Sequence, residues 1–325
     1  MMIVDRIYGS FEISDSVLLE LIDSAPVQRL KGVSQHGYPK ETRTTFPHYT
    51  RYEHSVGVML LLRMLGASLE EQIAGLLHDV SHTAFSHIID WLFGDPSKED
   101  YQDSTLKTCI QDSELGGILL KYGFDAEAIS DMEHGGKYGL LEREAPDLCA
   151  DRIDYALRDS RAFLGVDVTE CIRGIVVCDG ELAFKSRGSA KTFGNWYMKC
   201  QKEFWASDEA KLRYYLISEA LRLAMGKRML DKSDLYKAES TIITMLRKSN
   251  DAAVLERLEA GLGELHFIIS DKGPIALKKK LRYVDPKFLS EGKLVRLSKV
   301  DAGYKALIED EKKRSLKPVR VELVK

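Results

Sequence analysis

Two imidazoles and two carboxylates at separated points of the chain have the chemistry needed to hold a metal ion. They are His54, the adjacent pair His78 and Asp79, and Asp151. Neutral imidazole nitrogens and carboxylate oxygens suit a borderline divalent cation and leave coordination positions open for water and substrate. Such an ion can generate hydroxide at neutral pH and direct it at phosphorus. These residues therefore predict a metal-dependent phosphohydrolase.

A second group of polar residues follows the His-Asp pair. His82 lies one helical turn beyond His78, and His87 and Asp90 are three residues apart. An imidazole oriented by a carboxylate is a suitable general acid for an alkoxide leaving group. Two alternatives stay open, namely a second metal held by His82 and His87, and a purely structural His87. Taken singly, His54 can also be a core histidine and Asp151 a carboxylate at a helix N-terminus.

The composition is that of an ordinary globular protein and excludes several classes. Of 325 residues, 44% are hydrophobic and 30% charged, and the net charge of −3 gives no general attraction to nucleic acid. No apolar run approaches the roughly 20 residues that span a bilayer, and the N-terminus lacks a signal-peptide pattern. We therefore expect a cytoplasmic protein that binds neither membrane nor nucleic acid. Five scattered cysteines argue against disulfides and a cysteine-rich zinc site, and no phosphate-binding glycine loop occurs.

Helices must bring the four candidate ligands together. Apolar spacing predicts helices over residues 54–65, 69–80, 84–93 and 148–163. Helical bundles build metal sites from side chains of different helices in this way. His78 and Asp79 are neighbours, so they converge on one ion only if the second helix ends or distorts there. We expect such an end.

The character of the chain changes after residue 170. Residues 175–184 predict a hairpin with Asp179-Gly180 at its turn. Long helices are predicted over about 105–122, 195–229 and 233–248, and β-like segments at 265–269, 293–297 and 319–324. The predicted organisation is a catalytic core at 1–170, its continuation at 171–250 and a mixed subdomain at 251–325. Apart from these short β segments, an all-α character is expected.

Several longer segments carry a family resemblance, each enclosing one or more of the residues above. They are residues 8–14, 21–35, 46–58, 73–87 and 150–159. Together they resemble the HD-domain superfamily, and within it the deoxynucleoside triphosphate triphosphohydrolase branch. The resemblance implies a mainly α fold, an HD-domain helical bundle with a small β-hairpin and a C-terminal mixed α/β subdomain. It is good over about half of the chain and loose beyond about residue 190.

The resemblance also implies the site residues. His54, His78, Asp79 and Asp151 would be ligands of one divalent ion, which can be Mn, Fe, Ni, Zn or Mg because all accept nitrogen and oxygen donors. His82, His87 and Asp90 would serve phosphate contact and acid catalysis. The implied substrate contacts are Arg51 to phosphate or beside the base, Gln35 and Asp159 to the sugar 3′-OH, Tyr155 against the sugar so that a 2′-OH is excluded, and Arg152 in the place of a phosphate-binding lysine.

Three positions depart from the family pattern. Gln102 stands where relatives carry a histidine, and an amide cannot shuttle protons. His36 follows Gln35 where leucine is usual, so the sugar pocket is expected to differ. Residues 211–225 offer no convincing counterpart to the later phosphate- and base-contacting residues.

The predicted reaction is hydrolysis of a deoxynucleoside triphosphate to the deoxynucleoside and triphosphate by a metal-bound water. One alternative is a nucleotide phosphomonoesterase or phosphodiesterase that uses the same ion. A catalytically weakened nucleotide-binding sensor is another, because Gln102 replaces the family histidine. A nucleotide is the expected partner, and relatives suggest a homo-oligomer.

Overall fold

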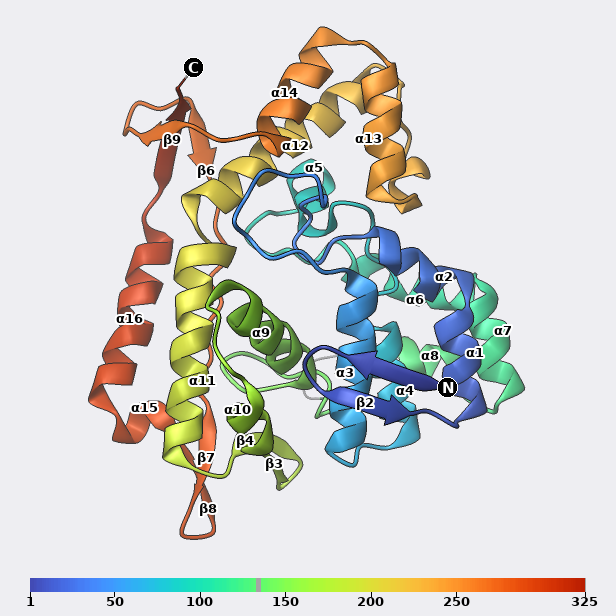
Figure 1. Ribbon diagram of the computed structural model, residues 1–325, viewed down its shortest axis with the longest axis vertical. Helices are drawn as coiled ribbons and strands as arrows, with labels where there is room; N and C mark the ends of the chain where they lie inside the picture. The colour runs from blue at the N-terminus through green and yellow to red at the C-terminus, as the bar shows by residue number, and fades with distance from the viewer. Residues whose placement is uncertain (133–135, 325) are drawn as a thin grey trace.

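The computed structural model describes residues 1–132 and 136–324 (Figure 1). Helices dominate it. Those of the N-terminal half are α1 (Ser16–Asp23), α2 (Ala25–Arg29), α3 (Arg51–Met64), α4 (Leu69–Leu77), α5 (Asp90–Phe93), α6 (Asp103–Gln111), α7 (Glu114–Lys121), α8 (Ala126–Ser130) and α9 (Ala150–Phe163). Those of the C-terminal half are α10 (Thr169–Arg173), α11 (Arg187–Cys200), α12 (Asp208–Gly226), α13 (Glu239–Lys248), α14 (Ala252–Leu262), α15 (Leu297–Val300) and α16 (Ala302–Leu316).

Nine strands among the described residues form three small sheets, so the fold is mainly α and an all-α description is imprecise. They are β1 (Met2–Asp5), β2 (Gly9–Glu12), β3 (Ile175–Cys178), β4 (Glu181–Phe184), β5 (Phe267–Ile269), β6 (Ile275–Leu277), β7 (Lys287–Ser290), β8 (Lys293–Arg296) and β9 (Val319–Leu323). The sheet orders are β1-β2, β3-β4-β7-β8 and β5-β9-β6. Strand β4 pairs with β7 in parallel, and this pairing ties the predicted hairpin to the C-terminal segment.

Helix α3 lies at the centre of the N-terminal half and packs against α4 and α9 (Figure 1). Its start is a capping box, in which the Thr50 side chain accepts from the Glu53 amide and the Glu53 side chain accepts from the Thr50 amide. Residues from His54 to Leu62 are buried along its length, so the helix is apolar on several sides. Polar side chains on the buried faces of this helix are held inside the protein, and His54 is one of them.

Helix α4 ends where convergence of His78 and Asp79 requires it. Its last residue is Leu77, His78 is the C-cap, and a tight turn follows in which the Val80 amide donates to the Leu77 carbonyl at 3.0 Å. The Arg29 guanidinium holds this turn by donating to the carbonyls of Val80 at 2.8 Å and His82 at 2.7 Å. The expected helix end is therefore present, and Arg29 satisfies two carbonyls of the turn that follows it.

A buried ion chain joins the N-terminal hairpin to the helical core. Arg158 on α9 donates from Nε to Asp154 Oδ2 and from its terminal nitrogen to Asp5 Oδ2, both at 2.7 Å. All three side chains are at most a few per cent exposed. Charges this deeply buried are tolerated only when they are paired. These ion pairs thus fix α9 against β1. Asp154, one of their members, also contacts His54 on α3.

Several predicted elements have different bounds. The expected helix over 84–93 is a short 3₁₀ turn (Ser86–Ile89) followed by α5, because Phe85 and Ser86 have positive φ angles of 65° and 46°. The expected helix over 105–122 is broken between α6 and α7, where Ser113 caps the second helix. The expected helix over 195–229 contains a π-helical turn, Gln201–Trp205, between α11 and α12. Strands β6 and β7 were not predicted.

The division at residues 170 and 250 and the homo-oligomer stay predictions. Among the described residues, no helix is both long enough and apolar enough to cross a bilayer.

The closeness of α3 and α9 at Gly57 gives a test of this packing. A Cβ on Gly57 would overlap the Arg158 guanidinium and the Asp154 carboxylate. We expect Gly57→Ala to lower the free energy of unfolding by about 1–3 kcal/mol, although alanine is the better helix former. The control is Gly117→Ala on α7, where the added Cβ has no neighbour within 4 Å. This control should gain up to about 1 kcal/mol. Urea denaturation measures both, and equal effects would contradict the packing.

Candidate active site

Donor atoms of four residues from α3, the α4 end and α9 lie near one point, and those of His54, His78 and Asp151 lie within 4.8 Å of one another. The His54 and His78 Nε2 atoms are 3.2 Å apart. Asp151 Oδ1 lies 2.9 Å from the first and 3.6 Å from the second. The Asp79 oxygens lie 3.7 Å and 3.5 Å from the same two nitrogens. Ligands about 2.0–2.2 Å from a shared ion have such separations, so the four predicted ligands lie close enough to share an ion, and their role as metal ligands stays a prediction.

The hydrogen bonds of the His54 and His78 imidazoles indicate that a cation is needed between their Nε2 atoms. His54 Nδ1 donates to Asp154 Oδ2 at 2.7 Å, and His78 Nδ1 donates to the Gly75 carbonyl at 2.8 Å. Both partners only accept, so in the neutral rings the protons sit on Nδ1 and both Nε2 atoms carry lone pairs. Two lone pairs that face each other at 3.2 Å repel unless a cation lies between them. The donor set therefore fits a divalent metal ion.

The titration of these groups agrees. Burial lowers the pKa of His54, but hydrogen bonds to Asp151 and Asp154 outweigh it and raise the pKa to about 9. Burial raises the pKa of Asp151, but His54 and His78 bring it below its usual range. The site thus attracts positive charge, and a proton and a metal ion compete for the same place.

The guanidinium group of Arg51 lies next to Asp79 and makes its hydrogen bonds within the protein. It is 2% exposed and donates to Asp79 Oδ2 at 2.6 Å, to Ser86 Oγ at 2.8 Å and to the Gln35 carbonyl at 3.1 Å. These bonds orient the carboxylate, and they leave Arg51 fewer donors for a ligand than the sequence suggested.

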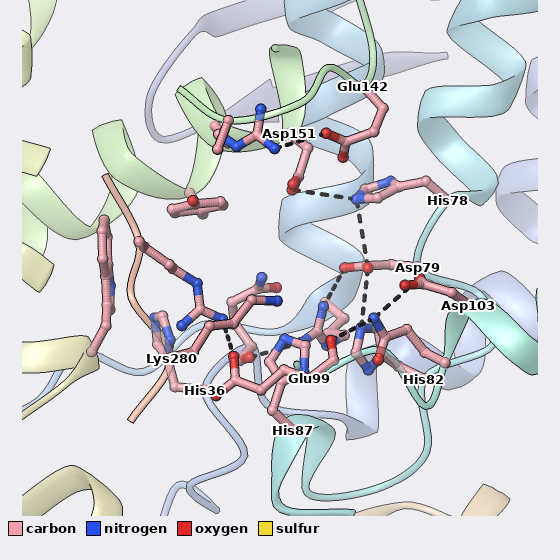
Figure 2. Close-up of a pocket in the computed structure, with 18 of the residues that line it drawn as sticks. His36, His78, Asp79, His82, His87, Glu99, Asp103, Glu142, Asp151 and Lys280 are labelled. Atoms are coloured by element: carbon pink, nitrogen blue, oxygen red, sulfur yellow. Dashed lines mark hydrogen bonds and ion pairs between the residues drawn. The ribbon is translucent and has the colours of Figure 1, made fainter. Parts of the chain in front are cut away.

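His78, Asp79 and Asp151 line a cavity of about 970 Å³, within the range of small-molecule sites. Figure 2 shows Asp151 and Glu142 on one side, His78, Asp79 and His82 along a wall, and Glu99, His87 and Lys280 across from Asp151. Residues from all parts of the chain therefore line one chamber.

His82 and His87 line the cavity together, with ring centroids 5.1 Å apart. His82 Nε2 lies 3.3 Å from Asp79 Oδ1, while burial and the Arg51 charge lower the His82 pKa to about 4. His87 Nδ1 is 3.5 Å from Asp90 Oδ2, which is longer than a hydrogen bond. Burial keeps the pKa of His87 well below its usual value. Both rings are neutral at neutral pH in this form.

Of the two residues predicted to contact the sugar 3′-OH, Gln35 lies at the cavity and Asp159 does not. Gln35 lines the cavity, and its buried Oε1 has no hydrogen-bond partner in the described part of the chain. Asp159 does not line the cavity, because its two oxygens face His36 Nε2 at 3.0 Å and Trp205 Nε1 at 2.7 Å. His36, noted as a departure from the family pattern, therefore stands in the cavity wall in front of Asp159.

Tyr155 and Arg152 both reach the cavity. The Tyr155 hydroxyl lies 2.5 Å from the Tyr197 hydroxyl, and the ring packs edge-on against Trp205. Arg152 lies 3.1 Å from Glu142 and donates to the Asp147 carbonyl at 3.0 Å. Gln102 also lines the cavity and bonds to the Glu99 carbonyl and the Asp103 side chain.

Sequence reasoning missed the cationic side of the cavity. Lys211 on α12 and Arg282, in the irregular segment 278–286 between β6 and β7, both pair with the buried Glu99. Lys280 lines the same side. The sequence gives no periodic signal here, since the run from Lys278 to Lys280 resembles a solvated surface. The π-helical turn that positions Phe204 and Trp205 was equally invisible.

Comparisons with known proteins identify the family of the chain. The HD domain family matches residues 51–121. The uncharacterized protein YdhJ of Bacillus subtilis is 36% identical over the full length of both chains. The metal-dependent phosphohydrolase cns2 of Cordyceps militaris is 33% identical over 79% of this chain and 77% of its own.

Two further similarities are more distant. A deoxynucleoside triphosphate triphosphohydrolase homolog of Dictyostelium discoideum is 28% identical over 56% of this chain and 41% of its own. The crystal structure of a phosphohydrolase from Bacteroides thetaiotaomicron superposes with a TM-score of 0.71 over 99% of both chains at 16% identity. The second similarity concerns the fold alone.

Removing the partner of His54 will test the ligand arrangement. Asp154→Asn keeps the size of the side chain but removes the charge that fixes His54 Nδ1–H. We expect affinity for Mn²⁺ to fall about 10- to 100-fold, as is usual for such outer partners of metal-bound histidines. The control, Asp23→Asn, changes an exposed carboxylate on α1. Metal content after dialysis against buffered Mn²⁺ reports the result, and unchanged loading of the Asp154 variant would refute the role.

Asp90→Asn will change how stability depends on pH. Burial raises the pKa of Asp90 to about 7, whereas an exposed aspartate titrates near about 3.9. Between these values the folded protein keeps a proton that the unfolded chain has released, so stability falls as pH rises. The amide lacks this proton.

The variant should therefore gain stability relative to the wild type between about pH 4 and about pH 7, by at most about 1.4 kcal/mol per pH unit. The difference should level off above this range. Urea denaturation at several pH values measures it, with Asp23→Asn as the control, and a constant difference for Asp90→Asn would exclude the assignment.

Proposed function

The chain belongs to the HD-domain metal-dependent phosphohydrolases, and from this premise we propose that it hydrolyses deoxynucleoside triphosphates to the deoxynucleoside and triphosphate. The observation that carries the proposal is the convergence of the His54 and His78 Nε2 atoms with the Asp79 and Asp151 carboxylates beside a cavity. The aromatic and cationic side chains of the same cavity suit a base, a sugar and a chain of phosphates.

In this proposal His54, His78, Asp79 and Asp151 hold one divalent ion. When bound, the ion supplies an activated water near neutral pH and polarises a phosphoryl oxygen. Arg51 orients Asp79 through their 2.6 Å contact. His82, which lies against Asp79 and faces the cavity, donates to a phosphate oxygen once the negative charge of the substrate favours its protonation.

His87 is the proposed acid. Its neutral state follows from burial and from the cations around it, and phosphate oxygens that enter the cavity reverse this balance by favouring the charged ring. The Asp90 carboxylate lies 3.5 Å from His87 Nδ1 and can orient the imidazole once the imidazole is protonated. The proton then passes to the departing 5′-oxygen. Gln102 cannot take part in this transfer.

Gln35 Oε1 and His36 Nδ1 are the proposed hydrogen-bond acceptors for the sugar hydroxyls. Gln35 Oε1 is buried without a partner in the described chain, and a hydroxyl of the substrate would satisfy it. His36 donates from Nε2 to Asp159, so its Nδ1 is left to accept from the sugar. The ring of Tyr155 closes the same side, and Arg152 contributes positive charge near Asp151.

A nucleotide phosphomonoesterase with the same ion is the second candidate. Asp159 is withdrawn behind His36, so the sugar is read differently from the family pattern. Carboxylates of Asp103, Asp131 and Glu144 also line the cavity, and they disfavour a highly charged substrate on their side.

Product analysis separates the two candidates. The protein is incubated with deoxynucleoside triphosphates, ribonucleoside triphosphates and monophosphates, with Mn, Mg, Ni or Co added in turn. The proposal expects deoxynucleoside and inorganic triphosphate in equal amounts. Orthophosphate from monophosphates alone would favour the second candidate, and no product under any condition would contradict both.

Asp151→Ala should abolish turnover while the protein stays folded. Loss of a ligand is expected to exceed the roughly 10- to 100-fold effect of losing an outer partner, and circular dichroism should be unchanged. The control is Asp112→Ala, an exposed position after α6. Wild-type activity of the Asp151 variant would remove the basis of the proposal.

A further inference from the structure

Segment 278–286 is an irregular strap between β6 and β7 that is held firmly at the cavity. Gln201, in the π-helical turn, donates to the Lys280 carbonyl at 3.0 Å, and Lys279 donates to Asp208 at 2.6 Å. The Tyr304 hydroxyl donates to the Val284 carbonyl at 2.7 Å. A segment without regular structure needs such partners for its backbone. Its place at the cavity is therefore built into the fold.

The strap brings positive charge to the cavity, and one carboxylate organises it. Glu99 is fully buried and pairs with Lys211 at 2.9 Å and with Arg282. The φ angle of Glu99 is +56°, a conformation that a non-glycine residue holds only when its surroundings require it. Three parts of the chain thus meet at Glu99, namely the loop after α5, α12 and the strap.

The charges on this side do not balance. Lys211, Arg282 and Lys280 face the cavity, and Glu99 ion-pairs with Lys211 and Arg282. The ammonium group of Lys280 makes no hydrogen bond or ion pair within the described residues, and this side chain is only partly exposed. Burial and the neighbouring Arg282 lower its pKa, although Glu99, Asp103 and Asp90 act in the opposite sense. A cation held in this way is stabilised by an anionic ligand.

We propose that Lys280 and Arg282 of the strap, together with Lys211, form a subsite for the phosphates of the substrate that are not attacked. The subsite takes linked phosphates and lies across the cavity from Asp151 (Figure 2). This inference rests on the proposed function, because it assumes that one phosphoryl group lies at the metal ligands. The sequence showed no convincing phosphate-contacting residues in this part of the chain, and Lys280, Arg282 and Lys211 would take that role.

Glu99 is the positioning residue of this subsite. It fixes the Arg282 guanidinium and the Lys211 ammonium before a ligand enters, so less side-chain freedom is lost on binding. Lys280 stays free to contact the ligand directly. Lys280 is therefore the residue whose removal tests the subsite with the least effect on the fold.

The test compares Lys280→Ala with Lys278→Ala, which removes an exposed lysine of the same strap. Calorimetric titration of the Mn-loaded 325-residue protein with inorganic triphosphate and with inorganic phosphate measures the binding of both ligands, and phosphate assay of the samples checks that the triphosphate stays intact. We expect Lys280→Ala to weaken triphosphate binding about tenfold or more, and to change phosphate binding far less. Lys280→Arg should restore most of the affinity, and Lys278→Ala should match the wild type.

Two results would overturn the subsite. One is an equal affinity for triphosphate in the Lys280→Ala and Lys278→Ala proteins. The other is an equal loss for phosphate and triphosphate, which would put Lys280 at the attacked phosphoryl group instead. If Lys280 governs triphosphate binding but the wild type releases only orthophosphate, the subsite stands and the proposed reaction fails.

Discussion

The Nε2 atoms of His54 and His78, 3.2 Å apart and able to face one cation together, are the arrangement on which the rest of the site depends. Each ring is turned by a partner that can only accept, Asp154 in one case and the Gly75 carbonyl in the other. Asp154 is in turn held by Arg158, and Arg158 by Asp5 on the first strand. The orientation of a metal ligand on α3 is therefore enforced by a chain of buried charges that ends at the N-terminal hairpin. Because every member is buried, the loss of one leaves another unpaired.

A second buried charge, Glu99, does for the opposite side of the cavity what Asp154 does for the ligands. It forms ion pairs with two cations, Lys211 on α12 and Arg282 on the strap, and so fixes their positions. Arg51 fixes Asp79 in the same manner. The cavity is thus lined by polar groups whose positions are set before any ligand arrives. Preorganisation of this kind is what makes charge stabilisation effective in a site that excludes water.

Sequence reasoning was strongest where chemistry and local structure coincide. His54, His78, Asp79 and Asp151 each lie within a helix or at its end, so helical spacing predicts their elements, while the family resemblance is what implies that they share one ion. It failed where placement depends on distant contacts. Asp159 has the expected identity, but His36 and Trp205 cover it, and only the π-helical turn explains how Trp205 reaches it. Lys280 and Arg282 lie in a segment without periodicity, whose position follows from Gln201 and from the β4–β7 pairing.

The distribution of charge over the cavity bears on which ligand can both enter and leave. A polyphosphate bound only by free cations would be held tightly, and its release would limit turnover. Here Glu99 offsets part of the charge of Lys211 and Arg282, Glu142 lies against Arg152, and Asp103 acts on Lys280. The cations are therefore numerous enough to orient linked phosphates but are individually moderated by carboxylates. Glu99 and Glu142 also hold Lys211, Arg282 and Arg152 in place before a ligand enters.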